Sequence, residues 1–122
     1  MILHLSKNKS LHDVQTEFTS YFPYLRIGFF NKRHKAFQGS DRAALLKPEA
    51  KLPLTGERDN LEVEIDETMT VKALEEMFKK QLNLNIQVFR KSGRAWLETT
   101  VTDNWTLRKQ NEEGKELSDL SF

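Results

Sequence analysis

Apolar residues recur along two parts of the chain with the same succession of spacings. In residues 2–32, and again in residues 61–94, apolar positions alternate every second residue, then recur every three or four residues, then alternate again. Alternation is typical of β-strands with one buried face, and spacings of three and four residues are typical of amphipathic helices. Each part therefore predicts a strand, a helix and a second strand.

The two parts match position by position, which predicts an internal repeat. Leu3 and Leu5 correspond to Val63 and Ile65 at an offset of 60 residues. The helical positions keep that offset, with Leu11, Val14, Phe18 and Phe22 matching Val71, Leu74, Phe78 and Leu82. After the helices the offset becomes 59, with Leu25, Ile27, Phe29, Phe30 and Lys32 matching Leu84, Ile86, Val88, Phe89 and Lys91. Coincidence is a poor explanation for matches that keep both order and spacing.

The length of 122 residues fits a single domain. Repeat one covers 2–32, a long connection covers 33–60, and repeat two covers 61–94. An added strand and a tail helix are expected within 95–114, with Asp103 capping the helix and Gly114 ending it. Residues 115–122 are expected to be frayed.

Two strand–helix–strand units with right-handed crossovers predict an α+β fold, with one antiparallel sheet and both helices on one face. This is the ferredoxin-like βαββαβ two-layer sandwich, here with an extra C-terminal edge strand and a short helix. In that plan the second and fourth strands form opposite edges of the sheet. Ser92 and Gly93 are expected to form the turn into the added strand, which places Lys91 opposite Arg94.

The alternation assigns each strand residue to one of two sheet faces. Residues expected to face the helices are Leu3, Leu5, Ile27, Phe29, Val63, Ile65, Ile86, Val88 and Leu97. Residues expected on the open face are His4, Arg26, Phe30, Glu62, Glu64, Gln87, Phe89, Trp96 and Glu98. The open face therefore carries three aromatic side chains.

Three interpretations account for these aromatics. Another part of the chain covers them, either Trp105 and Leu107 of the tail or Phe37 and Leu52 of the connection. Alternatively, they form a surface for a protein partner or for self-association, with candidate residues Phe30, Phe89, Trp96, His4 and Gln87. Finally, they resemble the RNA-stacking platform of RRM domains. Glu62 and Glu64 count against this last interpretation, because they would repel phosphates.

Two basic clusters offer a separate nucleic-acid hypothesis. They are Lys32, Arg33, His34 and Lys35 in one cluster, and Arg90, Lys91 and Arg94 in the other. A ferredoxin-like sheet would place the clusters at opposed corners, which does not make one phosphate groove. Solvated strand ends that discourage edge pairing are the simpler interpretation.

Catalytic and metal-binding patterns are scarce in the sequence. There is no cysteine, and no Gly-rich phosphate loop, HExxH, GxSxG or EF-hand pattern is present. His12 is expected on a solvated helix face, and His4 is expected to contact Glu62 or Glu64 across two strands. One histidine and one carboxylate fall short of a metal site, so neither a metal nor another cofactor is expected.

The formal net charge of +1 gives no overall field for nucleic acid or membrane. The sequence has neither a signal-peptide pattern nor an apolar run long enough to span a membrane, so a cytoplasmic protein is expected. Residues 87–111, QVFRKSGRAWLETTVTDNWTLRKQN, resemble a small family of uncharacterised bacterial proteins, which implies no function. The sequence therefore favours a non-catalytic interaction module that uses the open sheet face. Nucleic-acid binding and a small-ligand regulatory domain are the alternatives.

Overall fold

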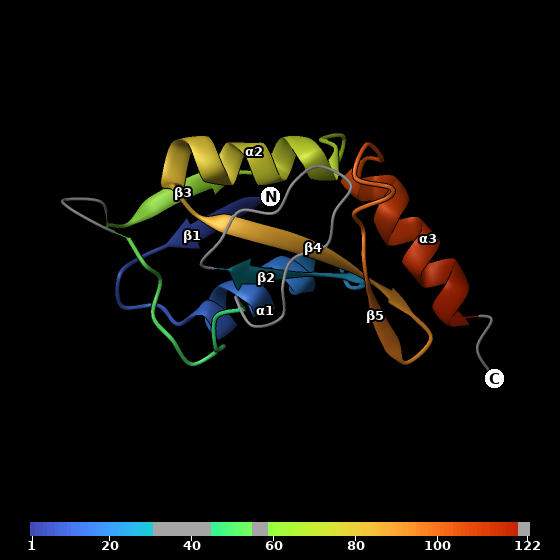
Figure 1. Ribbon diagram of the computed structural model, residues 1–122, viewed down its shortest axis with the longest axis horizontal. Helices are drawn as coiled ribbons and strands as arrows, with labels where there is room; N and C mark the ends of the chain where they lie inside the picture. The colour runs from blue at the N-terminus through green and yellow to red at the C-terminus, as the bar shows by residue number, and fades with distance from the viewer. Residues whose placement is uncertain (31–44, 55–58, 120–122) are drawn as a thin grey trace.

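The computed structural model describes residues 1–30, 45–54 and 59–119 and confirms a mixed α+β protein (Figure 1). Its elements are β1 Ile2–Leu5, α1 Leu11–Tyr21, β2 Leu25–Phe30, β3 Leu61–Glu64, α2 Val71–Leu82, β4 Asn85–Ser92, β5 Ala95–Glu98 and α3 Leu107–Asp119. Both strand–helix–strand units are therefore present. Within the described ranges, no helix is long and apolar enough to span a bilayer.

The strands form two antiparallel sheets rather than one continuous sheet. One sheet pairs β1 with β3, and the other has the order β2-β4-β5. A ferredoxin-like sheet would separate β2 and β4 to its two edges, whereas here they are hydrogen-bonded neighbours. The ferredoxin-like order is therefore not confirmed, and the expected placement of β2 and β4 at opposite edges is wrong.

The helices are distributed around the strands. Figure 1 shows α1 and α2 separated by the strands, with the long strand β4 running between them, and α3 beyond β4 near β5. Helix α1 packs against β1 and β2, while α2 and α3 both pack against β4. A single layer of two adjacent helices is thus not confirmed.

Local sequence explains where the first two helices begin and end. Ser10 caps α1 in a capping box, because its hydroxyl accepts from the amide of Asp13 and the Asp13 carboxylate accepts from the amide of Ser10. Thr70 caps α2 by accepting from the amide of Ala73. Helix α2 ends at Asn83, whose φ of 54° lies in the left-handed region that asparagine tolerates.

The buried face of the strands follows the predicted alternation. The side chains of Leu3, Leu5, Ile27, Phe29, Val63, Ile65, Ile86 and Val88 are each exposed by 5% or less. Phe18 and Phe78, which occupy matching positions on α1 and α2, are both fully buried. Leu97 is the exception, since it lies on the terminal strand β5 and is 45% exposed.

The turn between β4 and β5 lies one residue later than predicted. Ser92 pairs with Ala95 and Lys91 with Trp96, so the two loop residues are Gly93 and Arg94. Gly93 has a φ of 61°, and Arg94 keeps a negative φ. Glycine thus occupies the first loop position, as type II′ hairpin loops require.

Helix α3 is longer than predicted and starts later. Thr106 caps it by accepting from the amide of Lys109, so Asp103 is not its cap. Gly114 does not end the helix but lies buried in its middle, where an added Cβ would lie 2.9 Å from Tyr24 Cβ and 3.2 Å from the Lys91 carbonyl oxygen. The glycine therefore lets α3 approach β4 closely, and residues 115–119 are helical rather than frayed.

The pairing register is symmetric under exchange of the two units. Leu3 pairs with Val63, its own match in the repeat. In the other sheet Ile27 pairs with Val88 and Phe29 with Ile86, so two matched positions exchange partners. Such reciprocal contacts are those of a two-fold relation. The ladders β1–β3 and β2–β4 both join one unit to the other.

The equivalence extends into the long connection, where no residues had been matched between the two units. The amide of Leu11 donates to the Ala50 carbonyl over 2.8 Å, and the amide of Val71 donates to the Trp105 carbonyl over 3.1 Å. Three further contacts are equivalent in the two units. The hydrogen bond from His12 N to Pro48 O corresponds to that from Lys72 N to Asp103 O, and the one from Leu52 N to Lys9 O corresponds to that from Leu107 N to Met69 O. The bridge Ser10–Lys51 corresponds to the bridge Thr70–Thr106. Each unit thus has a segment that comes back to the start of its helix, residues 45–52 in the first unit and 103–107 in the second, which we call the returning segment. Its backbone carbonyls accept hydrogen bonds from the first free amides of the helix.

Candidate functional site

The five residues of the expected partner surface differ in their exposure to solvent. Phe30 is 5% exposed and Gln87 is fully buried, so both belong to the interior. Phe89 and Trp96 are half-buried, and His4 is exposed. Phe30 forms an isolated antiparallel bridge with Leu45 of the connection, next to the edge of β2. Leu52 and Leu107, two of the proposed covering residues, are buried in the core, and Phe37 lies outside the described residues.

Arg26 lies over the two remaining aromatics. Its guanidinium carbon is 4.7 Å from the Trp96 ring centroid and 5.7 Å from the Phe89 ring centroid. Both distances are within the range of cation–π attraction. Partial burial of the guanidinium lowers the pKa of Arg26, although arginine stays charged at any ordinary pH. We call Arg26, Phe89 and Trp96 the arginine–aromatic cluster.

No carboxylate among the described residues forms an ion pair with Arg26. Desolvation causes the shift of its pKa, with no contribution from a charge on the described residues. Arg26 is exposed overall, so water still solvates its charge and the fold does not require a counter-ion for it. Arg26 is instead held by two rings, which leaves its hydrogen-bond donors available to an incoming group.

A cavity of about 540 Å³ adjoins the cluster between α1 and β2. Its lining comprises His12, Gln15, Thr16, Thr19, Ser20, Arg26, Ile27, Gly28, Leu45, Leu46, Pro48 and Phe89. One wall is thus a polar face of α1, and the other walls are the edge of β2 and the start of the returning segment. The volume lies within the range of small-molecule sites, which is roughly 300–1,000 Å³.

Hydrogen bonds explain why the cavity walls hold their positions. Gln15 Nε2 donates to the Ile27 carbonyl over 2.8 Å, and Thr19 Oγ1 donates to the Leu25 carbonyl over 2.9 Å. Two side chains of α1 thereby hold the outer edge of β2 along the cavity. Further along β2, toward its C-terminal end, the amide of Leu46 donates to the Phe29 carbonyl over 2.7 Å. This hydrogen bond holds the returning segment against β2.

The comparisons with known proteins gave no relative. No protein-family model, curated protein or solved structure matches this chain. The resemblance noted for residues 87–111 therefore stays a prediction. The site must be interpreted from its own geometry.

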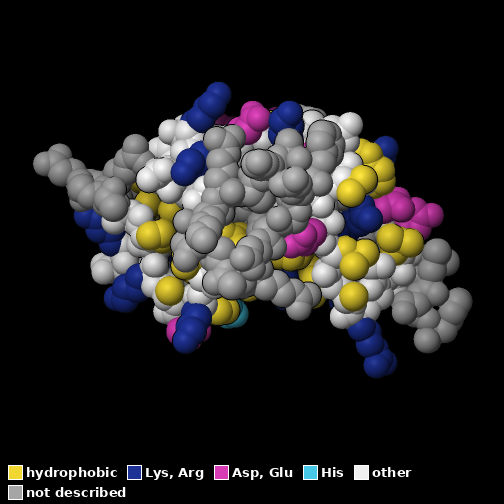
Figure 2. All heavy atoms as spheres, viewed as in Figure 1, with side chains coloured by type: hydrophobic (Ala, Val, Ile, Leu, Met, Phe, Trp, Pro, Cys, Tyr) yellow, Lys and Arg dark blue, Asp and Glu magenta, His cyan; other side chains and the backbone are white. Residues whose placement is uncertain are grey.

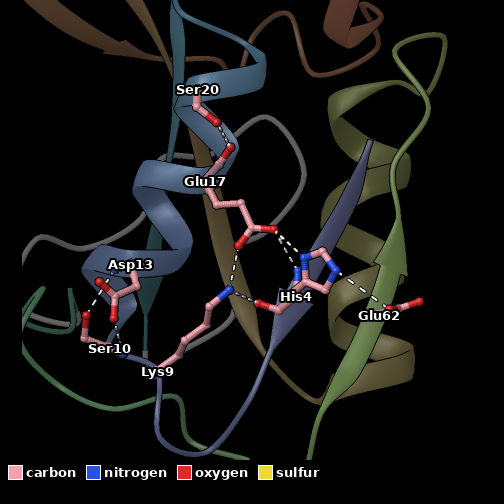
Figure 3. A network of polar contacts seen from close by, with 7 residues as sticks. All are labelled: His4, Lys9, Ser10, Asp13, Glu17, Ser20 and Glu62. Atoms are coloured by element: carbon pink, nitrogen blue, oxygen red, sulfur yellow. Dashed lines mark hydrogen bonds and ion pairs between the residues drawn. The ribbon is translucent and has the colours of Figure 1, made fainter.

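A second polar group joins β1 to α1 (Figure 3). His4 faces Glu62 across the β1–β3 ladder, as one of the two predicted pairings requires, with His4 Nε2 3.7 Å from the carboxylate. The sequence did not indicate Glu17 of α1, whose carboxylate contacts His4 Nδ1 at 2.9 Å and Lys9 Nζ at 2.6 Å.

The pKa of Glu17 is the result of opposed effects. Burial acts to raise it, but hydrogen bonds from the Lys9 ammonium, the His4 ring and the His4 amide together lower it below its ordinary value. The group is therefore a partly buried ion-pair network that ties α1 to β1. Within residues 1–30, 45–54 and 59–119, no three histidine or carboxylate side chains lie close enough to hold a metal ion.

Only one of the two basic clusters lies within the described residues. Lys32, Arg33 and Lys35 lie outside the described residues. Arg90 is engaged in the fold, because its Nη1 donates to Gln110 Oε1 over 2.8 Å and its guanidinium carbon lies 5.5 Å from the Trp105 ring centroid. Lys91 is half-buried, and Arg94 is exposed in the β4–β5 loop.

Sequence reasoning placed Arg26 on the open face but did not select it, and it missed the cavity-lining side chains of α1. Of the cavity-lining residues of α1, only His12 had been assigned a position, on a solvated helix face. One signal was available in Gly28, because glycine inside a strand marks a site where another group approaches the backbone closely. Here an added Cβ would lie 3.0 Å from Phe89 Cε2 and 3.1 Å from Leu45 Cδ1.

Proposed function

We propose that this protein is a small non-catalytic domain that binds a ligand in the cavity between α1 and β2. The observation that carries the proposal is the position of Arg26, which lines the cavity and carries no ion pair with a described carboxylate. Concave sites with a few convergent polar groups on apolar walls are the usual form of small-molecule sites. This cavity has apolar walls from Ile27, Leu46 and Phe89 and hydroxyls from Thr16 and Ser20.

A screen of chemically diverse fragments by ¹H–¹⁵N correlation spectra tests this proposal. Binding in the cavity is expected to shift the amide signals of residues 12–20 and 26–28 together and to spare those of α3. A Thr16→Leu variant, which adds bulk to the cavity wall at an exposed helical position, should weaken the same fragments. If no fragment shifts these amides, or if the shifts ignore the substitution, the cavity is not a binding site.

Self-association through β5 is a second candidate. Strand β5 is an edge strand of its sheet. Two of its side chains are accessible, because Trp96 is half-buried and Leu97 is 45% exposed. Val101, in the segment after β5, is 78% exposed. Figure 2 shows hydrophobic atoms gathered at the end of the molecule where β5 and α3 lie in Figure 1. A terminal strand with exposed apolar side chains is prone to pair with another chain.

Light scattering over a range of protein concentrations tests this candidate. A dimer that dissociates on Leu97→Lys, with the fold retained by circular dichroism, would support it. A monomer at all concentrations would remove it without affecting the cavity proposal.

A further inference from the structure

Among the described residues that line the cavity there is one arginine and one histidine, and no aspartate or glutamate. A ligand with a negative group would therefore meet no acidic side chain among these residues. A cationic ligand would lack a counter-charge there.

The geometry of Arg26 sets the kind of negative group. Its planar guanidinium presents paired N–H donors that match the two oxygens of a carboxylate. The rings of Trp96 and Phe89 lie 4.7 and 5.7 Å from the guanidinium carbon. Ring faces attract the charge without accepting all five N–H groups, and no described carboxylate forms an ion pair with Arg26, so N–H donors stay available.

The apolar part of the lining determines which chemical group the ligand must carry besides its negative group. Ile27, Leu45, Leu46, Pro48 and Phe89 supply apolar surface. On α1, Gln15 and Thr19 spend their donors on β2 carbonyls. A ligand rich in hydroxyls would find few free donors on this wall, whereas a hydrocarbon body would bury apolar surface at about 25 cal/mol per Å².

We infer that the cavity takes a small monocarboxylic acid with a hydrocarbon body, its carboxylate bound by Arg26 and its body between α1 and β2. This inference rests on the proposed function and names its ligand class. Inorganic phosphate has the charge but not the body, and a neutral amide has the body but not the charge. Both are therefore informative comparisons.

The experiment titrates hexanoate, benzoate and phenylacetate into the protein and follows ¹H–¹⁵N spectra. Hexanamide, benzamide and phenylacetamide serve as matched neutral compounds, and inorganic phosphate serves as the anion without a hydrocarbon body. At least one carboxylate is expected to shift the amides of residues 12–20 and 26–28, with its amide counterpart binding about tenfold more weakly or worse. Phosphate alone should give no saturable shift at these positions.

Variants then assign the contact. Arg26→Gln should weaken the carboxylate about tenfold or more and leave the amide unchanged. Arg26→Lys, which keeps the charge but loses the planar fork, should fall between the two. Arg94→Gln removes an exposed arginine from the β4–β5 loop and should change nothing. Melting temperatures of all three variants show whether each retains the fold.

Three results would overturn the inference. Equal binding of acids and amides in the cavity would refute the carboxylate preference while leaving a ligand-binding cavity. Absence of any shift with all three acids would also refute it, and the fragment screen would then decide separately whether the cavity binds anything. Loss of acid binding in Arg94→Gln, with Arg26→Gln unaffected, would place the anion at the loop instead.

Discussion

Gly28 and Gln87 face each other across β2 and β4 and occupy matching positions in the two units. The register is symmetric about this pair, but its two side chains differ. Gln87 is fully buried, whereas Gly28 leaves a space that the ring of Phe89 enters. The two units thus share a backbone arrangement and differ in side chains at the edge of the cavity.

Adding a branched side chain at residue 28 tests that close packing. In Gly28→Val, the first carbon alone would lie 3.0 Å from Phe89 Cε2 and 3.1 Å from Leu45 Cδ1, so the ring must move. The added bulk is expected to cost roughly 1–3 kcal/mol of unfolding free energy. Urea denaturation measures it, and unchanged stability with an unmoved Phe89 ring in NMR spectra would contradict the packing.

Substitutions at Leu52 and Leu107 test whether the structural equivalence of the two units includes the connection between them. Leu52 is 4% exposed and Leu107 is fully buried, at equivalent places beside the helix starts. Truncation of either to alanine should lower the unfolding free energy by about 2–5 kcal/mol. Leu97→Ala, at a 45% exposed position, is the control and should cost far less. A Leu52→Ala protein as stable as the control would show that the connection is not part of the core.

Whether replacing Gly114 by alanine stabilises or destabilises the protein depends on tertiary packing. In an exposed helix interior, replacing glycine by alanine stabilises by about 1 kcal/mol. Here the added carbon would lie 2.9 Å from Tyr24 Cβ and 3.1 Å from Arg90 Cγ, so Gly114→Ala should destabilise the protein. Glu116→Ala, on an exposed position of α3, should be nearly neutral. Thermal unfolding of both variants decides the sign, and a stabilised Gly114→Ala would mean that α3 does not pack closely on β4.

Glu17 gives the stability a predictable pH dependence. Its pKa in the folded protein lies below the ordinary value of 4.5, so the folded state favours the ionised carboxylate. That stabilisation is fully present above the pKa of the unfolded chain and is lost as the pH falls through the lower folded pKa. Glu17→Gln should therefore cost roughly 1–2 kcal/mol near neutral pH and progressively less below pH 4.5.

Glu62→Gln is the matched control for Glu17. The Glu62 side chain is 67% exposed, and exposed ion pairs contribute little. Denaturant titrations of both variants between acidic and neutral pH make the comparison. A penalty for Glu17→Gln that does not vary with pH would argue against the network in Figure 3.

The hydrophobic pattern predicted the elements well because it records burial. Phe18 and Phe78 are both fully buried, and Ile27 and Ile86 both face the core, as matching positions should. The same pattern does not record which strands are neighbours. An apolar residue on β2 is equally buried beside β3 or beside β4, so the order of the strands was open and the ferredoxin-like order was not confirmed.

Other features could not be predicted because they depend on contacts between distant segments. Gly114 after a helical run resembles a helix end, and only its contact with Tyr24 shows that it is a packing position. Leu52 and Leu54 are two apolar positions around Pro53, a run too short for its periodicity to indicate burial. The cavity depends on the space left at Gly28 and on the returning segment at Leu46. Neither is a pattern along the chain.

Pairing between the units is the central claim, and nuclear Overhauser effects measure it directly. The carbonyls of Ile27 and Val88 are bonded away from each other, to Gln15 and to Thr99, so this pair is of the type that brings opposite Hα protons close together. Cross-peaks are predicted between the Hα protons of Ile27 and Val88 and between those of Phe29 and Ile86. Cross-peaks joining β2 to β3, with none between β2 and β4, would contradict the account.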